Sequence, residues 1–274
     1  MSPVFDCTTE EGRREAVAKA AVGARSGALV VLPTDTLYGI GADAFSHEAV
    51  TALLDAKGRG REMPPPVLVP DARTVDGLAT DVPPYVRDLV AEFWPGPLTL
   101  VLKAQPSLAW DLGETAGTVA LRMPDDEVAL ALLQEVGPMA VSSANRTGHP
   151  ASRTVVEAAT QLGAAVEFYL DGGPVRGGLA STILDCTRED PVVLRHGAVS
   201  EEAIAAILAR SLPSADDGLV DGPEAGLDDG PDGDLDEGPD GDLDGDPGAL
   251  EWAPDRPGDG TDTPTATQES TRDE

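Results

Sequence analysis

Three closely spaced cations are the first residues in this sequence that could do chemistry. Lys57, Arg59 and Arg61 alternate with other residues in AKGRGREMPPP, a short distance after the two threonines of LPTDTLYGIGADA. A cationic run after a helix is usually a solvated surface, and the helix dipole favours cations at a C-terminus whatever their role. The run therefore indicates chemistry only if other segments bring polar groups to the same place.

Four polar segments follow short apolar runs of the chain. They are PTDTLYG after ALVVL, RMPD after TVAL, SSANRTG after PMAV, and RHG after PVVL. Ligands of open α/β sheets bind beyond the carboxyl ends of strands, so we expect one cleft at which the four segments meet. The groups gathered there would be the cations and the hydroxyl and amide side chains of Lys57, Arg59, Arg122, Arg195, Thr34, Thr36, Ser142, Ser143 and Asn145.

Such a set suits a polyanion, most simply a nucleoside triphosphate. The common phosphate-binding motifs GxxxxGK[ST] and GxGxxG do not occur in the sequence, and neither do the kinase motifs HRD and DFG. The predicted phosphate site is therefore not a P-loop, a Rossmann turn or a protein kinase site.

The elements that must position these segments alternate between helical and strand patterns. About seven strands and at least five helices are predicted, including a helix over residues 47–57 that begins at Ser46 and ends at Gly58, and one over 153–163 that begins at Ser152. Several consecutive strands near the C-terminal end favour a mixed sheet over a parallel one. We therefore expect an α/β fold, with an open twisted mixed sheet and flanking helices in three layers or on one face.

Composition divides the chain at residue 211. Of the formal net charge of −30, −19 lies in residues 212–274 and −11 in residues 1–211. The heptapeptide GPDGDLD occurs at Gly230 and again at Gly238, within a segment rich in Gly, Pro and Asp. We expect a folded catalytic domain over 1–211 and a disordered acidic tail over 212–274, because the tail offers too little apolar surface to offset chain entropy. A calcium-binding repeat is disfavoured, since two imperfect octads lack the paired glycines of such repeats.

Cysteine content and hydropathy predict the compartment. The two cysteines, Cys7 and Cys186, are far apart, which argues against a disulfide framework and fits a reducing cytosol. The N-terminal segment has no apolar core of a signal peptide, and no apolar run approaches the length of a membrane span. We expect a soluble cytoplasmic protein without a membrane partner.

Seven segments together resemble a known family. LPTDTLYGIGADA, AKGR, WPGPLTLVL, ALRMPD, SSANRTGHPAS, GG…STILD and VLRHGAVS occur in the order and spacing of the YrdC/TsaC family of threonylcarbamoyl-AMP synthases, from about Ala16 to Leu208. The resemblance implies a YrdC-like fold and a nucleotidyltransferase that converts L-threonine, bicarbonate and ATP into L-threonylcarbamoyl-AMP and pyrophosphate. Mg²⁺ would arrive with the ATP, because no carboxylate cluster resembles a metal site.

The resemblance also implies roles for named residues. The family's catalytic tetrad around the phosphates and the carbamate corresponds to Lys57, Arg59, Ser143 and Asn145. Positions that hold threonine correspond to Thr36, Arg122 and Ser181, with Arg122 suited to pair with its carboxylate. Nucleotide-contacting positions correspond to Arg59, Thr118, Ser143 and Arg195.

The chain departs from the family pattern at several positions near the expected pocket. Many members have His at Leu68, Ser at Ala151, Glu at Ala180 and Pro at His196, and they have Asn-Pro-Leu at residues 63–65. The tetrad itself is intact.

The predicted product has downstream partners. Other proteins would transfer the threonylcarbamoyl group to an adenosine of tRNA, and a direct contact between this chain and tRNA is a further expectation. Two other functions stay open: a relative that forms carbamoyl-adenylate from carbamoyl phosphate, and a non-catalytic module for double-stranded RNA. The net charge of −11 on residues 1–211 opposes the second of these.

Several residues have structural interpretations. Asp35 is interpreted as a turn or capping residue in preference to a general base. His47, His149 and His196 share no metal-ligand spacing and are expected at the surface. Cys186 is expected in the core.

Overall fold

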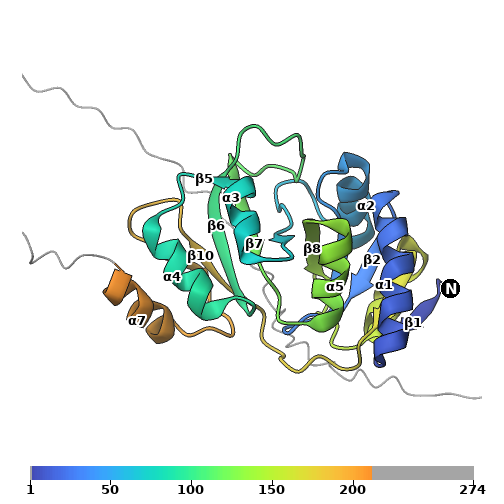
Figure 1. The fold of residues 1–274 in the computed structure, drawn as a ribbon. Coiled ribbons are helices and arrows are strands. Elements are labelled where there is room, and N and C mark those ends of the chain that lie inside the picture. Colours follow the sequence, from blue (N-terminus) through green and yellow to red (C-terminus); the bar gives the residue numbers. More distant parts are fainter. Residues whose placement is uncertain (1, 212–274) are drawn as a thin grey trace, which may run out of the picture.

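The computed structural model describes residues 2–211 (Figure 1). The boundary after residue 211, the predicted disorder of the tail and the calcium hypothesis concern residues 212–274, which lie outside the described residues.

Helices and strands alternate along the described chain. The helices are α1 (Glu10–Arg25), α2 (His47–Lys57), α3 (Val75–Leu78), α4 (Pro84–Phe93), α5 (Glu127–Val136), α6 (Val155–Leu162) and α7 (Glu201–Ser211). The strands are β1 (Val4–Asp6), β2 (Val30–Leu32), β3 (Gly39–Asp43), β4 (Val67–Leu68), β5 (Ala79–Thr80), β6 (Leu98–Ala104), β7 (Thr118–Arg122), β8 (Met139–Ser143), β9 (Phe168–Asp171), β10 (Thr182–Asp185) and β11 (Val192–Arg195).

All the strands belong to one sheet. Its order is β1-β9-β2-β3-β8-β4-β7-β6-β10-β11, and β5 pairs with β6. Parallel pairs, such as β6 with β10, alternate with antiparallel pairs, such as β6 with β7. The predicted mixed sheet is therefore confirmed.

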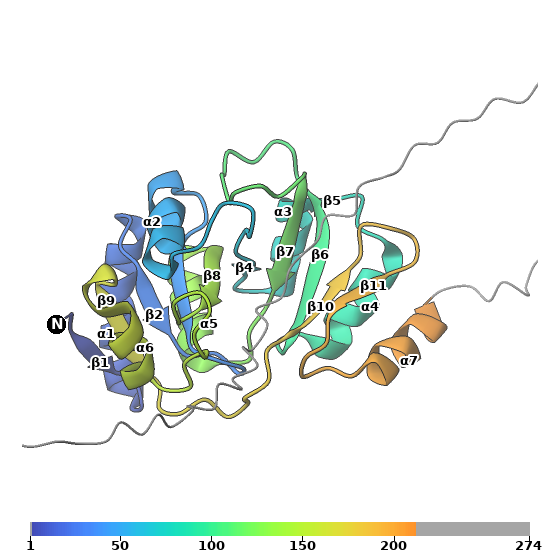
Figure 2. The same ribbon diagram turned by 180° about the vertical axis from the view of Figure 1, so that it is seen from behind.

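The two halves of the sheet are covered differently. Helices α1 and α5 pack on one face of the half that contains β2 and β9, and α2 and α6 cover the other face (Figures 1 and 2). In the half that contains β6, β7 and β10, the alternating leucines Leu98, Leu100 and Leu102 pack on the side of α4 and α7. The sheet is thus three-layered at one end, and at the other end one face lines the functional cavity described below.

Polar caps fix the starts of three helices. Thr9, Ser46 and Asp126 accept backbone N–H groups at the starts of α1, α2 and α5, which satisfies donors that a helix end leaves unpaired. The predicted cap of the 153–163 helix was wrong, because Thr154 caps α6 and Ser152 instead donates to the carbonyl of Ala144.

The strand β3 was not predicted, nor were β1 and β5. The residues of β3 read GIGAD, and glycine is uncommon inside strands. Here the glycines allow close packing, because a Cβ on Gly39 would lie 2.6 Å from Cγ1 of Val141 on β8. Antiparallel pairing on both sides buries β3 and carries the polar segment before it to the edge of the cavity.

Within residues 2–211, no helix combines the length and the apolar character that crossing a membrane requires. His47, His149 and His196 are exposed and Cys186 is buried, as predicted. Cys7 is also buried, and both cysteines are free.

The two thiols lie in the cores at opposite ends of the sheet, and they can report whether the ends unfold together. Burial raises the pKa of Cys7 to about 11 and that of Cys186 to about 12. Since the thiolate is the reactive form, both should resist iodoacetamide near pH 8 in the native protein. We expect both to become reactive in a single urea transition, measured by mass spectrometry of labelled peptides. Labelling of one thiol at clearly lower urea would show that the two ends unfold separately.

Candidate active site

A cavity of about 710 Å³ occupies the face of the sheet that β6, β7 and β10 expose beside β3 and β8. All four polar segments predicted to meet contribute to its wall, through Thr36, Arg122, Ser143 and Arg195 among others. The carboxyl ends of these four strands do not share one edge of the sheet, because β2 and β8 run antiparallel to β7 and β11. The four segments instead meet across the face of the sheet that lines the cavity.

Most of the predicted site residues line this cavity. They are Thr36, Arg59, Arg122, Ser143, Asn145, Ser181 and Arg195. Thr118 is not among the lining residues: it starts β7 at the end opposite Arg122, and its hydroxyl donates to the carbonyl of Thr115. The nucleotide contact of Thr118 thus stays a prediction.

Lys57 is also absent from the cavity wall. Its side chain is buried, and Nζ donates to the backbone carbonyls of Ser143 and Asn145, the latter at 2.8 Å. The ammonium thereby fixes the turn after β8 that presents Ser143 and Asn145. We infer that Lys57 contributes to the site chiefly by holding this turn.

Arg59 reaches the cavity from the loop that follows α2. Gly58 ends the helix with a φ of +62°, a conformation that glycine adopts without strain. Nη1 of Arg59 then donates to Oγ of Ser142 at 3.0 Å. In the same loop, Arg61 forms a surface ion pair with Asp111, which contributes little to stability, and its carbonyl accepts the N–H of Glu114.

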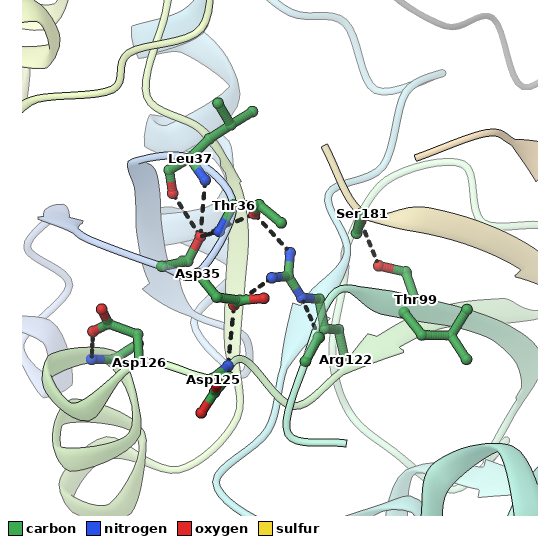
Figure 3. Close-up of polar contacts among 12 residues, drawn as sticks. Asp35, Thr36, Leu37, Thr99, Arg122, Asp125, Asp126 and Ser181 are labelled. Carbon is green, nitrogen blue, oxygen red and sulfur yellow. Dashed lines mark hydrogen bonds and ion pairs between the residues drawn. The ribbon is translucent and has the colours of Figure 1, made fainter. Parts of the chain in front are cut away.

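Arg122 is a buried cation of the site whose guanidinium has several hydrogen-bond partners (Figure 3). Nε donates to the carbonyl of Gly96 at 2.9 Å, Nη1 to Oγ1 of Thr36 at 3.0 Å, and Nη2 to Oδ1 of Asp35 at 2.5 Å. Burial lowers the pKa of the Arg122 guanidinium, and the charge and hydrogen bond of Asp35 act in the opposite direction. Two segments of the chain, the loop at Asp35 and Thr36 and the turn at Gly96, are therefore tied to one buried charge.

The interpretation of Asp35 as a local turn residue was wrong. Its carboxylate accepts from Arg122 and from the backbone N–H of Asp125, 87 and 90 residues further along the chain. Short-range patterns in the sequence carry no sign of these partners.

Thr99 is a lining residue that the sequence analysis did not select. It stands between Leu98 and Leu100 on β6, its side chain is buried, and its hydroxyl lies 2.8 Å from Oγ of Ser181. The available signal was strand alternation, which places Thr99 on the face opposite its leucine neighbours.

Residues 2–211 contain no group of three His, Cys, Asp or Glu side chains that could hold a metal ion. What the cavity offers a ligand is guanidinium, hydroxyl, amide and backbone groups, a set that suits carboxylate and phosphate oxygens.

The Asp35–Arg122 pair makes a testable contribution to stability. Asp35→Asn removes the counter-charge of a guanidinium whose side chain is 7% exposed, so we expect the free energy of unfolding to fall by about 3 kcal/mol in urea titrations. Asp125→Asn, at an exposed neighbouring carboxylate, is the matched control and should change it by less than about 0.5 kcal/mol. Equal stability of the two variants would contradict the importance of the pair.

Comparisons with known proteins assign the family. The profile of the Sua5/YciO/YrdC family, described as "Telomere recombination", matches residues 24–197. A Mycobacterium tuberculosis protein (strain ATCC 25618 / H37Rv), provisionally assigned as a threonylcarbamoyl-AMP synthase, is 53% identical over 208 residues, which cover 76% of this chain and 96% of that protein.

Two longer relatives agree. The threonylcarbamoyl-AMP synthase of Bacillus subtilis (strain 168) is 39% identical over 211 residues, which are 76% of this chain and 60% of that protein. The crystal structure of Pyrococcus abyssi Sua5 complexed with L-threonine is 34% identical, with a TM-score of 0.71 over 76% of this chain and 61% of that one. On the profile match, the sequence identities and the shared fold, the chain belongs to the Sua5/YciO/YrdC family.

Proposed function

We propose that this protein is a threonylcarbamoyl-AMP synthase, which makes L-threonylcarbamoyl-AMP and pyrophosphate from L-threonine, bicarbonate and ATP. One observation carries the proposal. A single cavity contains two polar regions. One is the buried guanidinium of Arg122 beside the hydroxyl of Thr36. The other is formed by the guanidinium of Arg59 and the hydroxyl and amide groups of Ser143 and Asn145. The first suits an amino-acid carboxylate and the second suits phosphate oxygens.

The chemistry needs fixed charges more than a nucleophilic side chain. The amine of threonine takes up bicarbonate to give a carbamate, with loss of water. A carbamate oxygen then forms a bond to the α-phosphorus of ATP, and the bond from that phosphorus to the leaving pyrophosphate breaks. Negative charge spreads over the phosphoryl oxygens, so donors fixed in advance lower the barrier most.

The described residues divide this work between the two ends of the cavity. Arg122 would hold the threonine carboxylate, because its position is fixed by Gly96, Thr36 and Asp35 and needs no rearrangement. Arg59 and the turn at Ser143 and Asn145 would face the phosphates. Lys57 keeps that turn in place from behind.

The remaining elements of the proposal concern partners. Mg²⁺ enters as the ATP complex, coordinated by triphosphate oxygens, and supplies charge neutralisation of the leaving group. The adenylate passes to proteins that complete N6-threonylcarbamoyladenosine in tRNA, and the reaction takes place in the cytoplasm. Direct contact with tRNA is not needed for the first step.

Pyrophosphate release tests the proposal. We expect release from MgATP to require L-threonine and bicarbonate together. Arg59→Met should reduce turnover on the order of a hundredfold at saturating ATP, because it removes one donor to the phosphoryl oxygens. Arg61→Met is the matched control: it changes an exposed arginine of the same loop that is absent from the cavity wall, and it should retain most activity.

The outcomes separate the alternatives. Release that needs carbamoyl phosphate and ignores threonine would identify the carbamoyl-adenylate-forming relative. Binding of double-stranded RNA with no pyrophosphate release under any substrate combination would favour the non-catalytic module. Either result contradicts the proposed activity.

A further inference from the structure

Four adjacent strands present one row of side chains to the cavity. Ile183 on β10 pairs with Thr99 on β6 and with Arg195 on β11, while Leu100 on β6 pairs with Leu121 on β7. Thr99 and Arg122 each lie one residue beyond this last pair, on the same face of neighbouring strands. The row therefore runs from Arg122 through Thr99 and Ile183 to Arg195, and all four residues line the cavity.

The hydrogen bonds of the Ser181 and Thr99 hydroxyl groups leave one of their two protons without an assigned acceptor. Nη2 of Arg195 donates to Oγ of Ser181 at 3.0 Å, and Oγ of Ser181 lies 2.8 Å from Oγ1 of Thr99. Among residues 2–211, the contact with Ser181 is the one hydrogen bond of the Thr99 side chain. Two hydroxyl groups carry two protons, and their mutual contact uses one of them.

The cation sets the direction of the chain. With Arg195 donating to Ser181, the arrangement in which Ser181 donates to Thr99 makes each bond polarise the next. The proton of Thr99 is then directed to an acceptor in the cavity. A buried hydroxyl without an acceptor costs free energy, so the part of the cavity that Thr99 lines suits a ligand oxygen that accepts this proton.

We propose that Thr99 is a specificity-determining residue that binds the side-chain hydroxyl of the amino-acid substrate, with Ser181 and Arg195 orienting the Thr99 hydroxyl. The inference rests on the proposed function, because it takes the substrate to be an amino acid whose carboxylate binds Arg122.

The spacing of the row fits such a substrate. Adjacent strands lie about 4.8 Å apart, so Thr99 is one strand spacing from Arg122. In threonine, three bonds separate the carboxyl carbon from the hydroxyl oxygen, and a carboxylate at Arg122 can therefore place its hydroxyl beside Thr99. Ile183, the next residue of the row, offers an apolar contact for the methyl group.

A neighbouring residue provides a matched control. Thr182 is as buried as Thr99, at 1% exposure, but it is not among the lining residues of the cavity. Its hydroxyl donates to the carbonyl of Val199 at 2.6 Å and accepts the N–H of the same residue. Thr182→Val thus removes a satisfied structural hydroxyl, whereas Thr99→Val removes one directed at the ligand.

The experiment compares L-threonine with L-2-aminobutyrate, which lacks the hydroxyl, as substrates for pyrophosphate release from ATP and bicarbonate. For Thr99→Val we expect kcat/KM for threonine to fall on the order of tenfold, kcat/KM for 2-aminobutyrate to stay unchanged, and the melting temperature to stay near that of the wild type. Thr99→Ser keeps the hydroxyl and should retain the preference for threonine. Thr182→Val should lower the melting temperature and leave the preference unchanged.

Other results overturn the inference. If Thr99→Val lowers kcat/KM equally for both amino acids, the Thr99 hydroxyl acts on the carboxylate or on the fold. If Thr99→Val leaves kcat/KM for threonine unchanged, Thr99 does not bind the substrate hydroxyl. Absence of threonine-dependent release in the wild type would instead overturn the proposed function. The two failures are therefore distinguishable.

Discussion

The buried charge of Arg122 is the constraint on which the cavity depends. A guanidinium removed from water is costly unless it is paired and hydrogen-bonded, and here the compensation comes from Asp35, Thr36 and the carbonyl of Gly96. These partners belong to the loop after β2 and to the turn before β6. The charge at the end of β7 therefore fixes two loops that border the cavity, and it remains in position for a carboxylate.

The uneven layering of the sheet explains why a polar site can exist at this place. Where helices cover both faces, both faces must be apolar, as the residues of β2 and its neighbours are. Where helices α4 and α7 pack on one face, the other face is free to carry Arg122, Thr99 and Arg195. Along β6, leucines alternate with Thr99, Val101 and Lys103, which is the sequence counterpart of this arrangement.

Local patterns in the sequence were sufficient for the mixed sheet, for several helix caps and for the convergence of four polar segments. They failed where the determining contact joins distant residues. Asp35 and Arg122 are 87 residues apart, and the role of Lys57 depends on a turn 86 and 88 residues away. The glycines of β3 oppose a strand by propensity, and tertiary packing against β8 overrides that preference.

The central claim is that one cavity binds the amino acid at Arg122 and the nucleotide phosphates at Arg59 and the turn of Ser143 and Asn145. A crystal structure of the protein with L-threonine and a non-hydrolysable ATP analogue tests it most directly. The account predicts the threonine carboxylate on the guanidinium of Arg122 and the triphosphate beside Arg59. A threonine bound away from Arg122, or a triphosphate outside this cavity, would contradict it.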